Sequence, residues 1–252
     1  MNTDDNDSIW VDRYTPTCLN EVILAPNIRN VLDGYIKKGT IPNLMFYGKP
    51  GIGKTLIAKL IAKELDASLM FINSSAETGV DVVRNKIIDF ANSVAMNNGL
   101  KIVLCDEFDY MSSAAQASLR DVIQSNSEDT RFLFTCNYDS KVMEPLQSRC
   151  IPLEIFFDIK DVLKRCFEIL DKEHIDYSEN KKDVAYIVKK NFPDIRRTIG
   201  TLELCCVNKK FELLNLNTSD NFQKVAKYIQ TNLNNPKECR KYLIANEWFA
   251  FS

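Results

Sequence analysis

The segment Gly48-Lys49-Pro50-Gly51-Ile52-Gly53-Lys54-Thr55 constrains the fold of this chain more than any other. It matches the pattern G-x-x-x-x-G-K-[ST], in which glycines let backbone N–H groups turn toward phosphate oxygens. The apolar run 41–47 before it predicts a buried strand, and the amphipathic run 56–65 after it predicts a helix. The N-terminus of that helix adds partial positive charge at the same place. A chance match in a glycine-rich turn is the alternative, and the flanking strand and helix argue against it.

This P-loop predicts a site for a nucleoside triphosphate with Mg²⁺. Lys54 is expected to reach the β- and γ-phosphates, and the hydroxyl of Thr55 is expected to bind Mg²⁺. The other residues predicted to contact the nucleotide here are Gly48, Pro50, Gly51, Gly53 and Leu56.

Two later apolar runs end in polar residues that suit the same chemistry. Run 102–107 ends in Asp106 and Glu107. Asp106 is expected to hold Mg²⁺, directly or through water, and Glu107 to polarise the water that attacks the γ-phosphate. Run 132–137 ends in Asn137, which could orient that water or touch the γ-phosphate. Two solvated acids at a strand end and a turn asparagine are the alternatives, and Asp109 is interpreted as structural.

Short apolar runs alternate with helical patterns from residue 41 to about 153, which predicts a parallel sheet covered on both faces. Functional side chains are expected at the carboxyl ends of its strands. The expected strands are 44–47, 69–73, 101–106, 132–137 and 151–155, with helices that begin near Lys54, Asp81, Ala114 and Glu144. Helical patterns without a good strand between them follow at 160–171, 180–191 and 194–206, and two more lie at 222–232 and 236–245.

Composition narrows the class of protein. The chain has 252 residues, is 45% hydrophobic and carries a net charge of −2, which argues against a pervasively basic nucleic-acid binder but allows a local basic patch. Its eight cysteines form no C-x-x-C pair and its one histidine is His174, which argues against a zinc site. Cys105 and Cys136 are expected in the core and His174 at the surface. No signal peptide or membrane-spanning run is visible, so an intracellular compartment and no membrane partner are expected.

Further segments carry a resemblance to a known family. They are Trp10-Val11-Asp12-Arg13-Tyr14-Thr15-Pro16, residues 80–86, residues 116–120, Ser148-Arg149-Cys150 and Pro193-Asp194-Ile195-Arg196. Together with the P-loop and the strand that ends in Asp106 and Glu107, they resemble the AAA+ ATPases of sliding-clamp loaders over about residues 9–215. The large, ATP-hydrolysing subunits of T4-type phages are the most similar. Thr15 and Asp121 depart from the family, which often has arginine at both positions.

The resemblance implies an α/β fold: a P-loop AAA+ parallel sheet with helices on both faces, then a small helical lid and a short helical C-terminal segment. The expected divisions are a disordered tail 1–8, a nucleotide-binding core 9–156, a lid 157–215 and a partial helical collar 216–252. Tyr14 is expected to lie against the adenine. Arg149 resembles the arginine finger that acts on ATP in the neighbouring subunit, and Arg196 the lid arginine that touches the γ-phosphate in its own subunit.

The implied function is ATP-driven loading of a sliding clamp onto primer–template DNA during replication, in the cytoplasm, which is the host's if a phage encodes the chain. Copies of the chain and a small subunit would form a ring or spiral. Arg84 and Lys86 are expected to contact DNA phosphates, although a solvated helix face is the alternative. Two other functions stay open: another AAA+ DNA-remodelling ATPase, such as a branch-migration helicase, and a non-hydrolysing scaffold subunit. The complete set of Lys54, Thr55, Asp106 and Glu107 argues against the scaffold.

Overall fold

The computed structural model describes residues 9–76, 80–94, 99–125, 130–207 and 210–213. The chain divides into two units, Met1–Phe211 and Glu212–Ser252, and the elements described below belong to the first. The predicted tail 1–8, the predicted helices 222–232 and 236–245, and the collar 216–252 lie outside the described residues.

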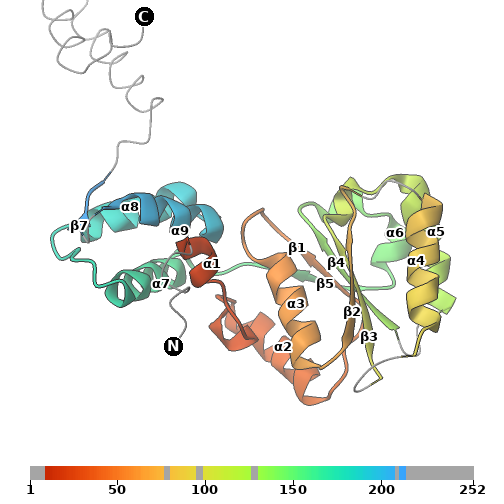
Figure 1. Cartoon of the computed structure of the whole chain (residues 1–252). Helices are drawn as coiled ribbons and strands as arrows, with labels where there is room; N and C mark the ends of the chain where they lie inside the picture. Colours follow the sequence, from red (N-terminus) through yellow and green to blue (C-terminus); the bar gives the residue numbers. More distant parts are fainter. Residues whose placement is uncertain (1–8, 77–79, 95–98, 126–129, 208–209, 214–252) are drawn as a thin grey trace, which may run out of the picture. The chain divides into compact units, whose positions relative to one another are not determined.

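The described part of the first unit is built on a parallel five-stranded sheet with the order β2-β3-β4-β1-β5 (Figure 1). The strands are β1 (Leu44–Tyr47), β2 (Ser68–Asn73), β3 (Lys101–Asp106), β4 (Thr130–Cys136) and β5 (Ile151–Glu154). The predicted parallel sheet is therefore confirmed, and predicted strands 44–47 and 101–106 coincide with β1 and β3. Asn137, predicted as the last residue of its strand, follows directly after β4, where the hydrogen-bonded ladder has ended.

Helices cover both faces of this sheet, as predicted. Figure 1 shows α2 and α3 on one face and α4, α5 and α6 on the other. Their bounds are α2 (Pro26–Lys37), α3 (Lys54–Glu64), α4 (Val80–Asn92), α5 (Ser113–Ser125) and α6 (Glu144–Gln147). Short 3-10 turns, η1 (Leu19–Glu21), η2 (Phe108–Tyr110) and η3 (Asp139–Lys141), lie in the connections. The predicted helix starts at Lys54, Asp81, Ala114 and Glu144 each fall within one residue of an observed start.

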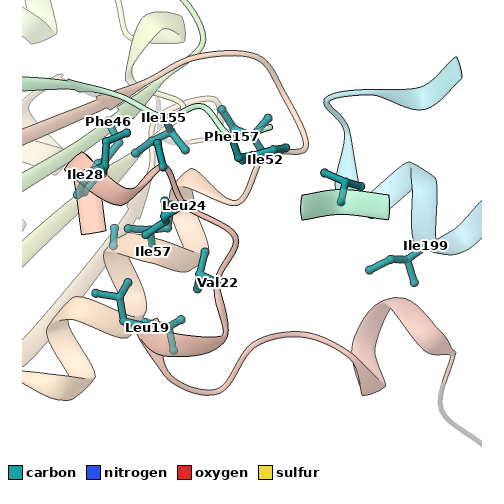
Figure 2. Packing of buried hydrophobic residues seen from close by; sticks show 14 of the residues in the cluster. Leu19, Val22, Leu24, Ile28, Phe46, Ile52, Ile57, Ile155, Phe157 and Ile199 are labelled. Atoms are coloured by element: carbon teal, nitrogen blue, oxygen red, sulfur yellow. The ribbon is translucent and has the colours of Figure 1, made fainter. Parts of the chain in front are cut away.

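Side chains of the strands divide into two cores because successive residues of a strand point to opposite faces. Phe46 of β1 and Leu104 of β3 pack toward α2 and α3, in the cluster that Figure 2 shows with Leu19, Leu24 and Ile57. Their neighbours in the opposite cluster, with α4 and α5, include Met45, Val103, Cys105, Phe132 and Phe134. Both faces are buried, which explains why the strands read as continuous apolar runs. Cys105 and Cys136 are buried, as predicted.

A helical lid follows the sheet. Its helices are α7 (Ile159–Lys172), α8 (Lys181–Asn191) and α9 (Ile195–Leu204). Their apolar faces share one cluster through residues such as Ile169, Ile187 and Leu202. Asp158 and Asp194 cap the first turns of α7 and α9 by accepting hydrogen bonds from Lys160 N and Arg197 N. The short helix α1 (Trp10–Arg13) packs on α9.

The end of the lid differs from the prediction. A helix was expected to continue through Cys206, but α9 ends at Leu204 and a short hairpin follows, formed by β6 (Cys206–Val207) and β7 (Lys210–Phe211). The hairpin brings Phe211 back onto the lid core, where this ring is buried. Tertiary packing thus overrides the local helical pattern. His174 is exposed, as predicted, and no helix among the described residues is long and apolar enough to cross a membrane.

Candidate nucleotide-binding site

A cavity of about 560 Å³ lies at the carboxyl edge of the sheet. Its walls come from the P-loop and the start of α3, from the ends of β3 and β4, from the segment that joins α1 to α2, and from the lid helices α7 and α9. The predicted site residues that line it are Pro50, Gly51, Gly53, Lys54, Thr55, Leu56, Asp106, Glu107, Asn137 and Arg196. The fold therefore brings together residues that are up to about 145 positions apart in the chain.

The P-loop bends at two positions whose backbone conformation suits only glycine, the residue without a side chain. Gly53 precedes α3 with φ +91°, and Gly51 has φ +75°. A Cβ at Gly51 would lie 2.1 Å from Oδ1 of Asp194, the residue that caps α9. Ile195 N, beside it in the lid, donates a hydrogen bond to Gly51 O at 3.1 Å. The P-loop is thus in direct contact with the lid.

Lys54 ties the P-loop to the end of β4. Its side chain is buried, and Nζ donates to Gly48 O at 2.8 Å, Lys49 O at 2.9 Å and Asn137 Oδ1 at 2.9 Å. Burial lowers the pKa of Lys54, and the negative charges of Asp109 and Asp106 act in the opposite direction. Three protein oxygens therefore hold the ammonium group at the loop, in the positions that phosphate oxygens would take.

A hydroxyl–carboxylate cluster occupies the next part of the cavity. Oδ1 of Asp106 accepts hydrogen bonds from Thr55 Oγ1 at 2.5 Å and from Thr135 Oγ1 at 2.6 Å. Oγ1 of Thr135 also accepts a hydrogen bond from Glu107 N at 3.1 Å. Carboxylate and hydroxyl oxygens are the ligands that Mg²⁺ prefers, so Thr55 and Asp106 suit the predicted metal.

Glu107 projects beside this cluster in a backbone conformation that is uncommon for a residue with a side chain. Its φ is +52°, in the left-handed region, and its side chain is exposed to the cavity that it lines. Such conformations cost about 1–3 kcal/mol and are concentrated at functional sites. The adjacent hydrogen bond from Glu107 N to Thr135 holds the backbone in this position.

Asp109 is buried beneath the site. Neither of its carboxylate oxygens has a hydrogen-bond partner within the described part of the chain. Its charge opposes the effect of burial on Lys54. Burial raises the pKa of the neighbouring Cys136 thiol to about 12, and the charge of Asp109 acts in the same direction. Asp109 thus adds negative potential below the P-loop lysine without lining the cavity.

Five predicted site residues do not line the cavity: Gly48, whose carbonyl oxygen accepts a hydrogen bond from Lys54 Nζ, and Tyr14, Arg149, Arg84 and Lys86. Tyr14 does not line the cavity: its hydroxyl donates to Glu173 Oε1 at 2.5 Å on the lid, although the neighbouring Thr15 and Pro16 do line it. Arg149 donates to Pro145 O at 2.6 Å and to Gln124 Oε1 at 3.1 Å. Arg84 and Lys86 are exposed on α4. An adenine contact by Tyr14 itself is thus not what this geometry favours.

Thr135 and Arg165 are among the lining residues that the sequence analysis did not predict. Thr135 is a buried hydroxyl within the apolar stretch 132–136 of β4, two residues before Asn137, and this polar position was the available signal in the sequence. Arg165 of α7 lines the lid side of the cavity and donates to Tyr14 O at 3.4 Å. Its position in a regular amphipathic helix gave no such signal. Among the described residues, no group of three or more His, Cys, Asp or Glu side chains is arranged to hold a metal ion.

Comparison with family models divides the first unit where the first lid helix, α7, begins. Residues 44–158 match the "ATPase family associated with various cellular activities (AAA)", and residues 158–212 match the "Sliding-clamp-loader large subunit, AAA+ ATPase lid domain". The boundary coincides with Asp158, which caps the first lid helix.

Relatives and solved structures extend this similarity. The replication factor C small subunit of Sulfolobus acidocaldarius is 32% identical over 243 residues, which cover 93% of this chain and 70% of that protein. Replication factor C subunit 4 of Homo sapiens is 38% identical over 210 residues, 77% of this chain and 57% of the human protein. The chain thus spans less than two thirds of the human relative's length. The Thermotoga maritima RuvB Holliday junction branch migration motor has a TM-score of 0.54, with 19% identity over 86% of this chain and 79% of its own, which shows similarity of fold alone.

Proposed function

The chain belongs to the replication factor C family of AAA+ clamp-loader ATPases, and on that premise we propose that it is an ATP-hydrolysing subunit that opens a sliding clamp and loads it onto primer–template DNA. The observation that carries the proposal is the convergence of Lys54, Thr55, Asp106, Glu107 and Asn137 on one cavity. The match of residues 158–212 to the lid of clamp-loader large subunits supports the narrower expectation of a large subunit, and likeness to those of T4-type phages stays a proposal.

Each side chain has a separate part in ATP hydrolysis. The Lys54 ammonium holds the β- and γ-phosphates in place of the loop carbonyls that it now contacts. Thr55 and Asp106 would hold Mg²⁺, which supplies neutralisation of phosphate charge when bound. Glu107 accepts a proton from the attacking water, and Asn137, already in contact with Lys54, orients that water toward the γ-phosphate. Arg196 reaches the same cavity from the lid.

Arg149 is proposed to act in trans. Its guanidinium contacts Pro145 and Gln124 and does not line the cavity of its own chain, which is compatible with a role at the nucleotide site of a neighbouring chain. A second copy of the chain in a ring or spiral, with a small subunit completing the particle, would bring Arg149 to the γ-phosphate of its neighbour. A guanidinium suits this position because it stays charged and matches phosphate geometry.

DNA binding is proposed for α4. Arg84 and Lys86 are exposed on this helix, close to its start at Val80. One chain offers few such charges. Several copies arranged in a spiral would together place many positive charges along a DNA backbone, although the composition of each chain is not basic.

Two other functions are less well supported. A branch-migration motor shares the fold, but only at 19% identity, and the clamp-loader lid model favours the loader. A non-hydrolysing scaffold subunit would not need the complete set of Lys54, Thr55, Asp106 and Glu107 that lines the cavity.

The proposed function is tested by separating nucleotide binding from turnover. Lys54→Ala is expected to abolish productive ATP binding, because it removes the cation of the P-loop. Glu107→Gln is expected to bind ATP normally and to stop hydrolysis, because the amide cannot accept the proton. Binding titrations and phosphate release, measured with the clamp, the small subunit and DNA present, check both expectations. Glu144→Gln, an exposed acid on α6, is the control. Normal turnover by Glu107→Gln would remove Glu107 from the catalytic role.

A further inference from the structure

The N-terminal helix α1 is bound to the lid by side chains at both of its ends. At its start, Trp10 N donates a hydrogen bond to Glu203 Oε1 of α9 at 3.1 Å, and the indole of Trp10 is buried. At its end, Arg13 and Tyr14 both reach the end of α7, where Glu173 is the cap residue. Helix α1 therefore belongs to the lid by its contacts, although it precedes the sheet in sequence.

Glu173 is the centre of the second attachment. Its Oε1 accepts from Arg13 Nη1 at 2.7 Å and from Tyr14 OH at 2.5 Å. The side chains of Arg13 and Glu173 are only 21% and 19% exposed, so water screens their ion pair less than it screens a pair at the surface. Burial, and then the hydrogen bond to Glu173, raise the pKa of Tyr14 to about 12. The Tyr14 hydroxyl therefore remains a donor at neutral pH.

The chain is anchored again, this time to the core, after only two residues. Thr17 O accepts a hydrogen bond from Lys63 Nζ at 3.0 Å, and Leu19 N donates to Glu64 Oε1 at 2.6 Å. Lys63 and Glu64 end α3, the helix that starts at the P-loop. Thr15 and Pro16 lie between the two anchors, and both line the nucleotide cavity.

We propose that Glu173 is a positioning residue for the nucleotide: by holding Arg13 and Tyr14 on the lid, it keeps the Thr15–Pro16 segment in place as a wall of the cavity. This inference rests on the proposed nucleotide function. The cavity lining contributed by this part of the chain includes the apolar side chains of Val11, Pro16, Val22 and Ile23 as well as Thr15 and Glu21. It therefore suits the nucleoside better than the phosphates, which belong to Lys54 and Thr55. Loss of the anchor should therefore weaken contacts with the base and spare those with phosphate.

The experiment compares two ligands. ATP uses the whole cavity, whereas inorganic tripolyphosphate uses only the P-loop end. Isothermal titration with each, in the presence of Mg²⁺, is made on the unmodified chain, Tyr14→Phe, Glu173→Ala and the double variant. Tyr177→Phe is the matched control, because its hydroxyl makes a similar hydrogen bond to Asp171 Oδ1 at 2.8 Å that lies wholly within the lid.

Tyr14→Phe is expected to weaken ATP binding about tenfold, as loss of one hydrogen bond to a charged group does, and to leave tripolyphosphate binding unchanged. The double variant should be no weaker than Glu173→Ala, because both changes break the same attachment. Tyr177→Phe should bind both ligands normally. If Tyr14→Phe leaves the ATP affinity unchanged, or weakens the binding of both ligands equally, this inference is wrong while the proposed function still stands. Failure of the unmodified chain to bind ATP would overturn the proposed function, and the inference with it.

Discussion

Replacing Thr135 with valine tests whether the hydroxyl that contacts Asp106 and Glu107 is needed for the proposed ATP turnover. Valine keeps the branched shape, so the packing of β4 is preserved. The O–H is removed, and with it the 2.6 Å hydrogen bond to Asp106 Oδ1 and the acceptor for Glu107 N at 3.1 Å. Thr135 is 2% exposed, so water cannot easily replace its hydroxyl. The change therefore affects the carboxylate proposed to bind Mg²⁺, Asp106, and the backbone of the proposed catalytic base, Glu107, together.

The size of the effect follows from these two hydrogen bonds. A hydrogen bond to a charged group is worth about 1.5–3 kcal/mol, and the lower end applies because Asp106 is partly exposed. The bond from the Glu107 backbone adds about 1 kcal/mol. The free energy of unfolding should thus fall by roughly 2.5 kcal/mol. Asp106 keeps its hydrogen bond to Thr55, so binding of ATP and Mg²⁺ should persist. If the poorer orientation of Asp106 and Glu107 raises the activation free energy by about 1.4 kcal/mol, turnover falls about tenfold.

Chemical denaturation and ATP turnover on the same preparations measure the two quantities. Thr130→Val is the control, since Thr130 is equally buried but starts the same strand, at the end away from the site. Turnover in Thr135→Val equal to that of the unmodified chain, with ATP and Mg²⁺ saturating, would refute the argument that Thr135 orients Asp106 and Glu107.

Two further predictions follow from the proposed assembly. Arg149→Ala should lower turnover by up to about 10³–10⁵-fold with little loss of ATP affinity. Mixing this variant with a Lys54→Ala chain should restore some activity. If the two chains assemble together and no activity returns, action in trans is contradicted. Neutralising Arg84 and Lys86 should weaken binding to unrelated DNA sequences equally. The slope of the logarithm of the binding constant against the logarithm of the salt concentration should become shallower by about one for each DNA phosphate that is no longer neutralised. Titrations at several salt concentrations measure both effects. An unchanged slope and affinity would assign both side chains to a solvated helix face.

The parts of the fold that were predictable are those encoded by neighbouring residues. The glycines of the P-loop, the apolar run before it and the helix that starts at Lys54 lie within one short stretch, and the structure has them as the sequence indicates. Asp106, Glu107 and Asn137 were predictable as neighbours because parallel strands end at a common edge. That rule brings them to one cavity without any knowledge of individual contacts.

What could not be predicted depends on contacts between distant residues. Tyr14 and Glu173 are 159 positions apart, and nothing near Tyr14 indicates that its hydroxyl faces the lid. The same holds for Arg165, whose place in α7 does not reveal that this turn faces the cavity. The hairpin after α9 escaped prediction because it depends on burying Phe211 against helices formed much earlier in the chain.

Glycine is required at position 51 for two reasons, and only one of them can be inferred from the sequence motif. The motif alone explains this glycine by the left-handed turn of the P-loop, and its φ of +75° agrees. The lid adds an independent reason, since a Cβ there would lie 2.1 Å from Asp194 Oδ1 and Ile195 N bonds to Gly51 O. Asp194 also caps α9, the helix whose first turn carries Arg196. A side chain at Gly51 would therefore disturb the loop that cradles phosphate and also displace the helix that carries the lid arginine, so these two halves of the cavity are adjusted to each other through one residue.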